Sequence, residues 1–174
     1  MQKNKLLIIV FFTLLVVINS AGIFPVSIEK AVQKQGWKNA FLTVGLENDS
    51  ALLFMEEEKG EIRLASAYKG IFGWKIVDDS GLLSVSEDVE GFSGTEGSIK
   101  IKSNKKLHYF MGIIVDKNID NMTFKLDEET KERTLYRTIT QNGTRIYYTT
   151  LDKELDEVTY IAYNHLDQII YSKP

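Results

Sequence analysis

The chain has 174 residues, two prolines, no cysteine and a formal charge of −3, from 21 Lys and Arg against 24 Asp and Glu. This length suits one domain or two small ones, and the lack of cysteine excludes disulfides, thiolate zinc sites, a cysteine nucleophile and a lipid-modified N-terminal cysteine. Hydrophobic residues make up 44% and charged residues 26%, which excludes a disordered chain, and the near balance of charge provides no field that would attract nucleic acid.

The N-terminal region carries the clearest signal. The stretch from Leu6 to Val26 contains no charge and follows Lys3 and Lys5; it is long enough to cross a bilayer core about 30 Å thick as a helix. The same pattern fits a secretory signal cleaved after Ser20 or after Gly22, but neither position offers the preferred small-x-Ala pattern, which favours an uncleaved anchor. The positive-inside rule keeps the N-terminus in the cytoplasm. We therefore expect a single-pass cell-membrane protein with its C-terminal part outside, or a secreted protein if cleavage occurs.

The part expected outside the membrane is more acidic than the whole chain. Without Lys3 and Lys5 it has 19 basic and 24 acidic residues, a charge of −5. This charge disfavours a second, electrostatic contact with an anionic membrane surface. An exported chain without cysteine suits a bacterium that makes little use of disulfides.

The first exported half, residues 27–86, is expected to hold one short helix and an antiparallel meander. Ser27 is a suitable N-cap, and Gly36 is a natural residue just past a helix end. Four apolar runs separated by turn residues predict strands at 41–46, 51–55, 62–68 and 71–77. Packing the apolar face of the helix on this meander would bury both.

Glycine and acidic residues dominate 78–97, which predicts a surface loop with one short strand at 82–85 and a linker at 87–97. The second half, 98–174, is rich in strands again, and its strongest hairpin signal is Asn142-Gly143. Seven short runs at regular spacing predict a β-sandwich-like region: 98–102, 107–115, 122–126, 134–140, 145–151, 158–163 and 168–171. The fold class is therefore mainly β, or α+β overall, with one continuous α+β sheet as the alternative.

Signatures of catalysis are weak in this sequence. His108 lies in an apolar strand, His165 lies in a turn, and the G-x-S-x-G pattern of a serine nucleophile is missing. The 24 acidic residues supply many carboxylate pairs, but no spacing selects one pair for glycoside hydrolysis. The sequence therefore favours a non-enzymatic protein without a cofactor, and an envelope hydrolase that uses paired carboxylates is the alternative.

One segment resembles a calcium-binding loop. Asp116, Asn118 and Asp120 occupy positions 1, 3 and 5 of the pattern. Position 6, however, is Asn121 where the pattern needs glycine, position 12 is Asp127 where it needs a bidentate glutamate, and the flanks are typical of strands. Asp and Asn are also common turn residues, so a plain strand connection is favoured over a metal site.

An aromatic surface is the candidate binding site. Phe72 and Trp74 lie in the string Lys-Gly-Ile-Phe-Gly-Trp-Lys, and Tyr147 and Tyr148 follow the Asn-Gly turn. These four side chains could form a partly exposed patch that contacts a partner. The simpler interpretation of the string is a tight turn followed by a core tryptophan.

Several short motifs carry a resemblance to a family. The Gly-Ile-Phe-Gly-Trp-Lys string at 70–75, the Gly-Ile-Ile stretch at 112–114 and the Gly-Thr-Arg-Ile-Tyr-Tyr stretch at 143–148 resemble small exported or membrane-anchored proteins of low-GC Gram-positive bacteria. The resemblance implies location and architecture and carries over no catalytic residue. Together these observations predict a membrane-anchored, extracytoplasmic binding or regulatory module of the bacterial cell envelope, with an envelope protein or component as its partner.

Overall fold

The computed structural model describes residues 9, 13, 25–38, 40–57, 60–84, 89–102, 105–126, 131–154 and 157–173. This part of the chain is mainly β: strands make up 62%, in three antiparallel sheets, and one helix is short. Most of the stretch from Leu6 to Val26, the expected anchor or signal, lies outside the described residues. Among the residues that are described, no helix is long and apolar enough to cross a membrane.

The short helix α2 (Ile28–Lys34) forms where the sequence predicts it. Its N-cap is Ser27, whose hydroxyl accepts a hydrogen bond from the backbone N–H of Lys30, and it ends before Gly36, which has a φ of 76°. A left-handed residue at this position is the usual glycine termination of a helix. Ala31 and Val32 are buried against the outer face of the first sheet.

The first sheet, sheet A, is the meander that the sequence predicts, with its four strands paired in chain order. The strands are β1 (Ala40–Leu46), β2 (Ser50–Glu56), β3 (Ile62–Gly70) and β4 (Gly73–Leu83). Side chains along β2 point alternately to the two faces of sheet A, as they do on any strand. Leu53 and Met55 pack with the helix, while Leu52 and Phe54 face the second sheet.

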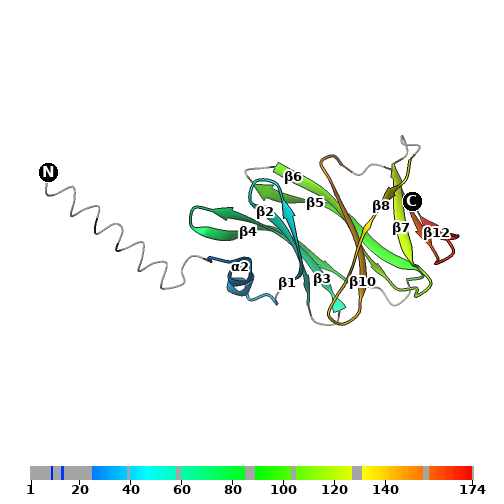
Figure 1. Cartoon of the computed structure of the whole chain (residues 1–174), viewed down its shortest axis with the longest axis horizontal. Helices are drawn as coiled ribbons and strands as arrows, with labels where there is room; N and C mark the ends of the chain where they lie inside the picture. The colour runs from blue at the N-terminus through cyan, green and yellow to red at the C-terminus, as the bar shows by residue number, and fades with distance from the viewer. Residues whose placement is uncertain are drawn as a thin grey trace.

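The second sheet, sheet B, has the strand order β5-β6-β10-β9. It is the middle layer, because its two faces pack in separate cores, and its strands β5, β6 and β10 are labelled in Figure 1. Its strands are β5 (Phe92–Lys102), β6 (Lys105–Ile114), β9 (Tyr136–Ile139) and β10 (Arg145–Leu151). Along β6, Tyr109 and Met111 join the core shared with sheet A, while Phe110 and Ile114 join the core shared with the third sheet.

The third sheet, sheet C, covers the other face of sheet B and has the strand order β12-β11-β7-β8. Its strands are β7 (Asn121–Leu126), β8 (Arg133–Thr134), β11 (Val158–Tyr163) and β12 (Ile169–Lys173). The layers are therefore helix, sheet A, sheet B and sheet C. Residues of both expected halves, 27–86 and 98–174, meet in the core between sheets A and B.

The prediction of a loop over 78–97 was wrong at both ends, because β4 continues to Leu83 and 92–97 form the first half of β5. The glycines of β5 have a packing role. A Cβ added to Gly94 would lie 2.5 Å from Cε2 of Phe110, and one added to Gly97 would lie 2.8 Å from the hydroxyl oxygen of Tyr109. Glycine in a strand often marks such a close approach.

Candidate binding site

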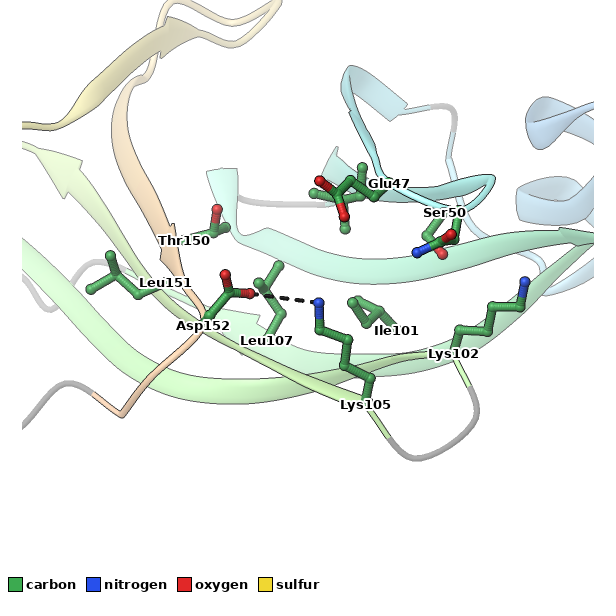
Figure 2. Close-up of a pocket in the computed structure, with 11 residues that line it drawn as sticks. Glu47, Ser50, Ile101, Lys102, Lys105, Leu107, Thr150, Leu151 and Asp152 are labelled. Carbon is green, nitrogen blue, oxygen red and sulfur yellow. Dashed lines mark ion pairs between the residues drawn. The ribbon is translucent and has the colours of Figure 1, made fainter.

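A cleft of about 550 Å³ opens at one end of the A and B layers. It lies where the β1–β2 turn meets the ends of β5, β6 and β10, and Figure 2 shows side chains from all these segments around it. We call it the A/B cleft. Its lining residues are Leu46, Glu47, Asn48, Ser50, Ile101, Lys102, Lys105, Leu107, Thr150, Leu151 and Asp152.

The inner wall of the A/B cleft is apolar. Ile101 and Leu107 belong to the buried core between the two sheets, and Leu46 and Leu151 are half-buried beside it. Among the residues that the structure describes, no loop covers the core at this end, so an apolar group from another molecule could extend it. Each methylene that such a group buries is worth about 0.8 kcal/mol.

The rim of the A/B cleft is charged. The Nζ of Lys105 lies 3.7 Å from Oδ1 of Asp152, and Figure 2 shows this pair near the opening, with Glu47 on the turn between β1 and β2. Lys102 lines the rim from the end of β5. Both partners of the ion pair are exposed, so the pair is worth about 0–1 kcal/mol and a ligand could displace either member.

The geometry of the β1–β2 turn places Glu47 at this rim. Asn48 and Asp49 both have left-handed backbone conformations, with φ of 58° and 56°. Asn and Asp tolerate that conformation better than other side chains apart from glycine. The turn is also bonded to β3, because the backbone N–H of Lys69 donates to the carbonyl oxygen of Asp49 at 2.8 Å.

The structure does not bring the four predicted aromatic residues into one surface. Phe72 lies exposed in the β3–β4 turn, and Trp74 is half-buried in the cluster around α2, as the core-tryptophan interpretation expects. Tyr147 is only 1% exposed between sheets B and C, whereas Tyr148 is half-buried on the side of sheet A. Neighbouring residues on a strand point to opposite faces of the sheet, so Tyr147 and Tyr148 cannot share a surface.

Tyr148 instead takes part in a row of rings that the sequence does not reveal. Ring centroids are 6.4 Å apart for Phe41 and Phe54, 4.7 Å for Phe54 and Tyr148, and 5.5 Å for Tyr148 and Tyr136. The row runs from β1 to β9 across the space between sheets A and B. Its members come from four separate strands, so no local motif could have indicated it.

The three residues of the calcium-like pattern belong to the connection between β6 and β7, and the cation that this loop surrounds is Arg145. Its guanidinium donates to the carbonyl oxygens of Asp116 at 2.5 Å and Ile119 at 2.6 Å. The Asp120 carbonyl accepts from the Tyr147 hydroxyl at 2.6 Å. In the part of the chain that the structure describes, no three His, Asp or Glu residues are grouped so that they could hold a metal. The loop is therefore fixed by β10.

The carboxylate of Asp116 also holds this loop. The backbone N–H of Asn118 donates to it at 2.8 Å and lowers the pKa of the Asp116 carboxyl, and the Tyr171 hydroxyl, at 3.0 Å, lowers that pKa further. Because the pKa is lower in the folded chain than in the unfolded chain, ionised Asp116 stabilises the fold above about pH 4, and this contribution is lost as the pH falls through the folded-state pKa.

We therefore expect Asp116→Asn to destabilise the protein more at pH 7 than at pH 3. Urea unfolding at the two pH values measures the difference. Asp152→Asn removes the same charge from a side chain that is 85% exposed and serves as the matched control. An Asp116→Asn effect that is equally large at both pH values would contradict a role for the ionised carboxylate.

The remaining candidates for catalysis are spread over the molecule. His108 is half-buried on β6, and His165 is exposed in the turn between β11 and β12. Glu47 and Asp152 are two carboxylates that line one cleft. Within the described residues of the A/B cleft, this pair of carboxylates is what favours the hydrolase alternative.

Comparisons with protein-family models, curated proteins and solved structures found no match to this chain.

Proposed function

We propose that this protein is an extracytoplasmic, membrane-anchored module of the cell envelope that binds an envelope protein through the A/B cleft. The observation that carries the proposal is the combination of an open apolar core and two lysines at its rim. This combination suits a partner that inserts an apolar side chain and places a carboxylate next to it. Lys102 and Lys105 would then contact the carboxylate, and Asp152 would be released from its weak ion pair.

The proposed location rests on the sequence. Twenty-one uncharged residues from Leu6 to Val26 follow two lysines, a pattern that is long enough to span and that orients the folded part outward. Cleavage after Ser20 or after Gly22 would release the same module from the membrane. Mass spectrometry of the protein purified from envelopes decides between these alternatives, because it shows directly whether residues 1–22 remain.

Site-specific photo-crosslinking of the full chain in intact envelopes tests the binding role. A photoreactive residue at Thr150, on the wall of the A/B cleft, is expected to capture a defined partner. The same residue at Asn118, in the loop at the opposite end of β6, is the control and is expected to capture none. The double variant Lys102→Glu and Lys105→Glu should reduce the yield from Thr150 severalfold, because it removes both ammonium groups from the rim. Equal yields from the two positions would contradict a binding role for the cleft.

The hydrolase alternative makes a different prediction for the same cleft. If Glu47 and Asp152 acted as acid and base, Glu47→Gln would abolish turnover of an envelope glycan while leaving the crosslink in place. A binding module instead shows no such turnover in either form. Measuring both the crosslink and glycan release on one set of variants separates the two functions.

A further inference from the structure

The turn between β3 and β4 exposes apolar side chains at its tip. Ile71 is 96% exposed and Phe72 is 54% exposed; among the described residues Ile71 is the most exposed large apolar side chain. Figure 1 shows that the hairpin projects from sheet A at the end of the molecule where the chain enters α2. Apolar side chains that are exposed next to one another can mark a contact site for a partner or a membrane.

The same tip is joined to the residues that end the uncharged N-terminal stretch. The backbone N–H of Trp74 donates to the carbonyl oxygen of Pro25 at 2.8 Å. Gly73, with φ of 98°, allows this approach, since an added Cβ would lie 2.1 Å from that oxygen. Val26, the last residue of the stretch, is itself 54% exposed. If the stretch spans the bilayer, then the hairpin tip must lie at its outer surface.

The face around the tip is basic, although the exported part as a whole is acidic. A hollow of about 880 Å³ on this face contains no carboxylate among the described residues that line it, and it is lined by Lys34, Lys69, Lys75 and Lys102. Lys69 and Lys75 flank the exposed tip on the two strands of the hairpin. The charge of −5 belongs to the exported part as a whole. It does not disfavour membrane contact at this face, because positive charge is concentrated where the chain would leave the bilayer.

We propose that the β3–β4 hairpin tip forms a second contact with the membrane, in which Ile71 and Phe72 enter the outer leaflet and the surrounding lysines bind anionic lipid headgroups. Apolar and aromatic side chains bordered by lysines are the usual composition of an interfacial anchor. This inference rests on the proposed function in one respect, since it takes the stretch from Leu6 to Val26 as the anchor. Two contacts fix the orientation of the module, whereas a single anchor would not.

This orientation also bears on the binding site. Lys102 lines both the basic hollow and the A/B cleft, so the two surfaces adjoin. With the hairpin tip in the bilayer, the A/B cleft opens close to the headgroups. Its partner would therefore be a segment that lies near the membrane surface, such as the membrane-proximal part of another anchored protein.

The experiment uses the full chain, which contains no native cysteine, so a single introduced cysteine carries one environment-sensitive fluorophore. Ile71→Cys labels the tip, and Leu166→Cys labels the β11–β12 turn, another exposed apolar position. The labelled chains are reconstituted in vesicles of phosphatidylcholine alone or of equal parts phosphatidylcholine and phosphatidylglycerol. We expect emission from position 71 to shift to shorter wavelength and to be quenched by nitroxide-labelled lipid, most strongly in the anionic vesicles, and emission from position 166 to stay as in water.

Charge reversal tests the lysines. Lys69→Glu with Lys75→Glu, in the Ile71→Cys background, is expected to remove the extra quenching in anionic vesicles. Lys117→Glu with Lys131→Glu, at two exposed positions outside the hollow, is the control of equal charge and is expected to leave it unchanged. Equal effects of the two double variants would overturn the headgroup contact.

Failure of the anchor and failure of the tip contact give different results. A full chain that does not float with the vesicles contradicts the anchored location itself, and the tip contact with it. A chain that floats while position 71 reports water, as position 166 does, overturns the tip contact and leaves the anchored module standing.

Discussion

Replacing Phe54 with alanine is expected to lower the free energy of unfolding by about 3–5 kcal/mol, the usual cost of removing a buried ring. Phe54 is 1% exposed in the core between sheets A and B, and its ring lies between those of Phe41 and Tyr148. The flanking strands are held by their own ladders, so they cannot close over the cavity. The aromatic contacts add about 0.5–1.5 kcal/mol to the transfer energy that is lost. Urea unfolding followed by circular dichroism measures the change.

Two variants set the scale for this prediction. Phe54→Leu keeps most of the volume and is expected to cost clearly less than alanine. Phe41→Ala removes a ring that is half-buried on the edge strand β1 and should also cost less, because solvent already reaches it. If Phe41→Ala were as damaging as Phe54→Ala, the stability of this end of the molecule would depend on the edge and not on the core between the sheets.

Most strands could be predicted from the sequence because their signals are local. Apolar runs and the turn residues between them are read over a few positions, and β10 after Asn142-Gly143 is an example. The number of layers could not be predicted in the same way. Residues 51–55 and 107–114 are nearly continuous apolar runs, which is typical of strands covered on both faces, but a run does not say which elements cover it. That depends on pairing between distant segments.

The candidate site also has some features with a local sequence signal and others that depend on distant segments. The period of two along a strand would have been enough to separate Tyr147 from Tyr148, so that signal was available. The A/B cleft had no such signal, because its lining comes from the β1–β2 turn, the ends of β5 and β6 and the end of β10. The contacts of Arg145 could not be predicted from the sequence either, since the carbonyl groups that it contacts lie 26 and 29 residues away in the chain.

Replacing Arg145 with leucine is expected to destabilise the protein by about 3–6 kcal/mol, because two hydrogen bonds from a charged donor are lost, each worth about 1.5–3 kcal/mol. Its guanidinium fixes both ends of the β6–β7 loop through the carbonyl groups of Asp116 and Ile119. The Ile119 side chain is fully buried in the core between sheets B and C. Releasing the loop therefore also loosens that core. Urea unfolding gives the free energy, and hydrogen exchange at residues 116–120 reports the loop directly.

Arg137 provides the matched control for this effect. It donates to the Asp120 carbonyl of the same loop at 3.0 Å, but its side chain is half exposed, and the Tyr147 hydroxyl already satisfies that oxygen at 2.6 Å. Arg137→Leu is therefore expected to cost about 1 kcal/mol or less. Arg145→Lys should fall between the two leucine variants, since an ammonium keeps the charge but cannot reproduce the fork that reaches both carbonyl groups. If Arg145→Leu and Arg137→Leu had equal effects, then surface charge would explain both, and the loop would be held by its own turn residues.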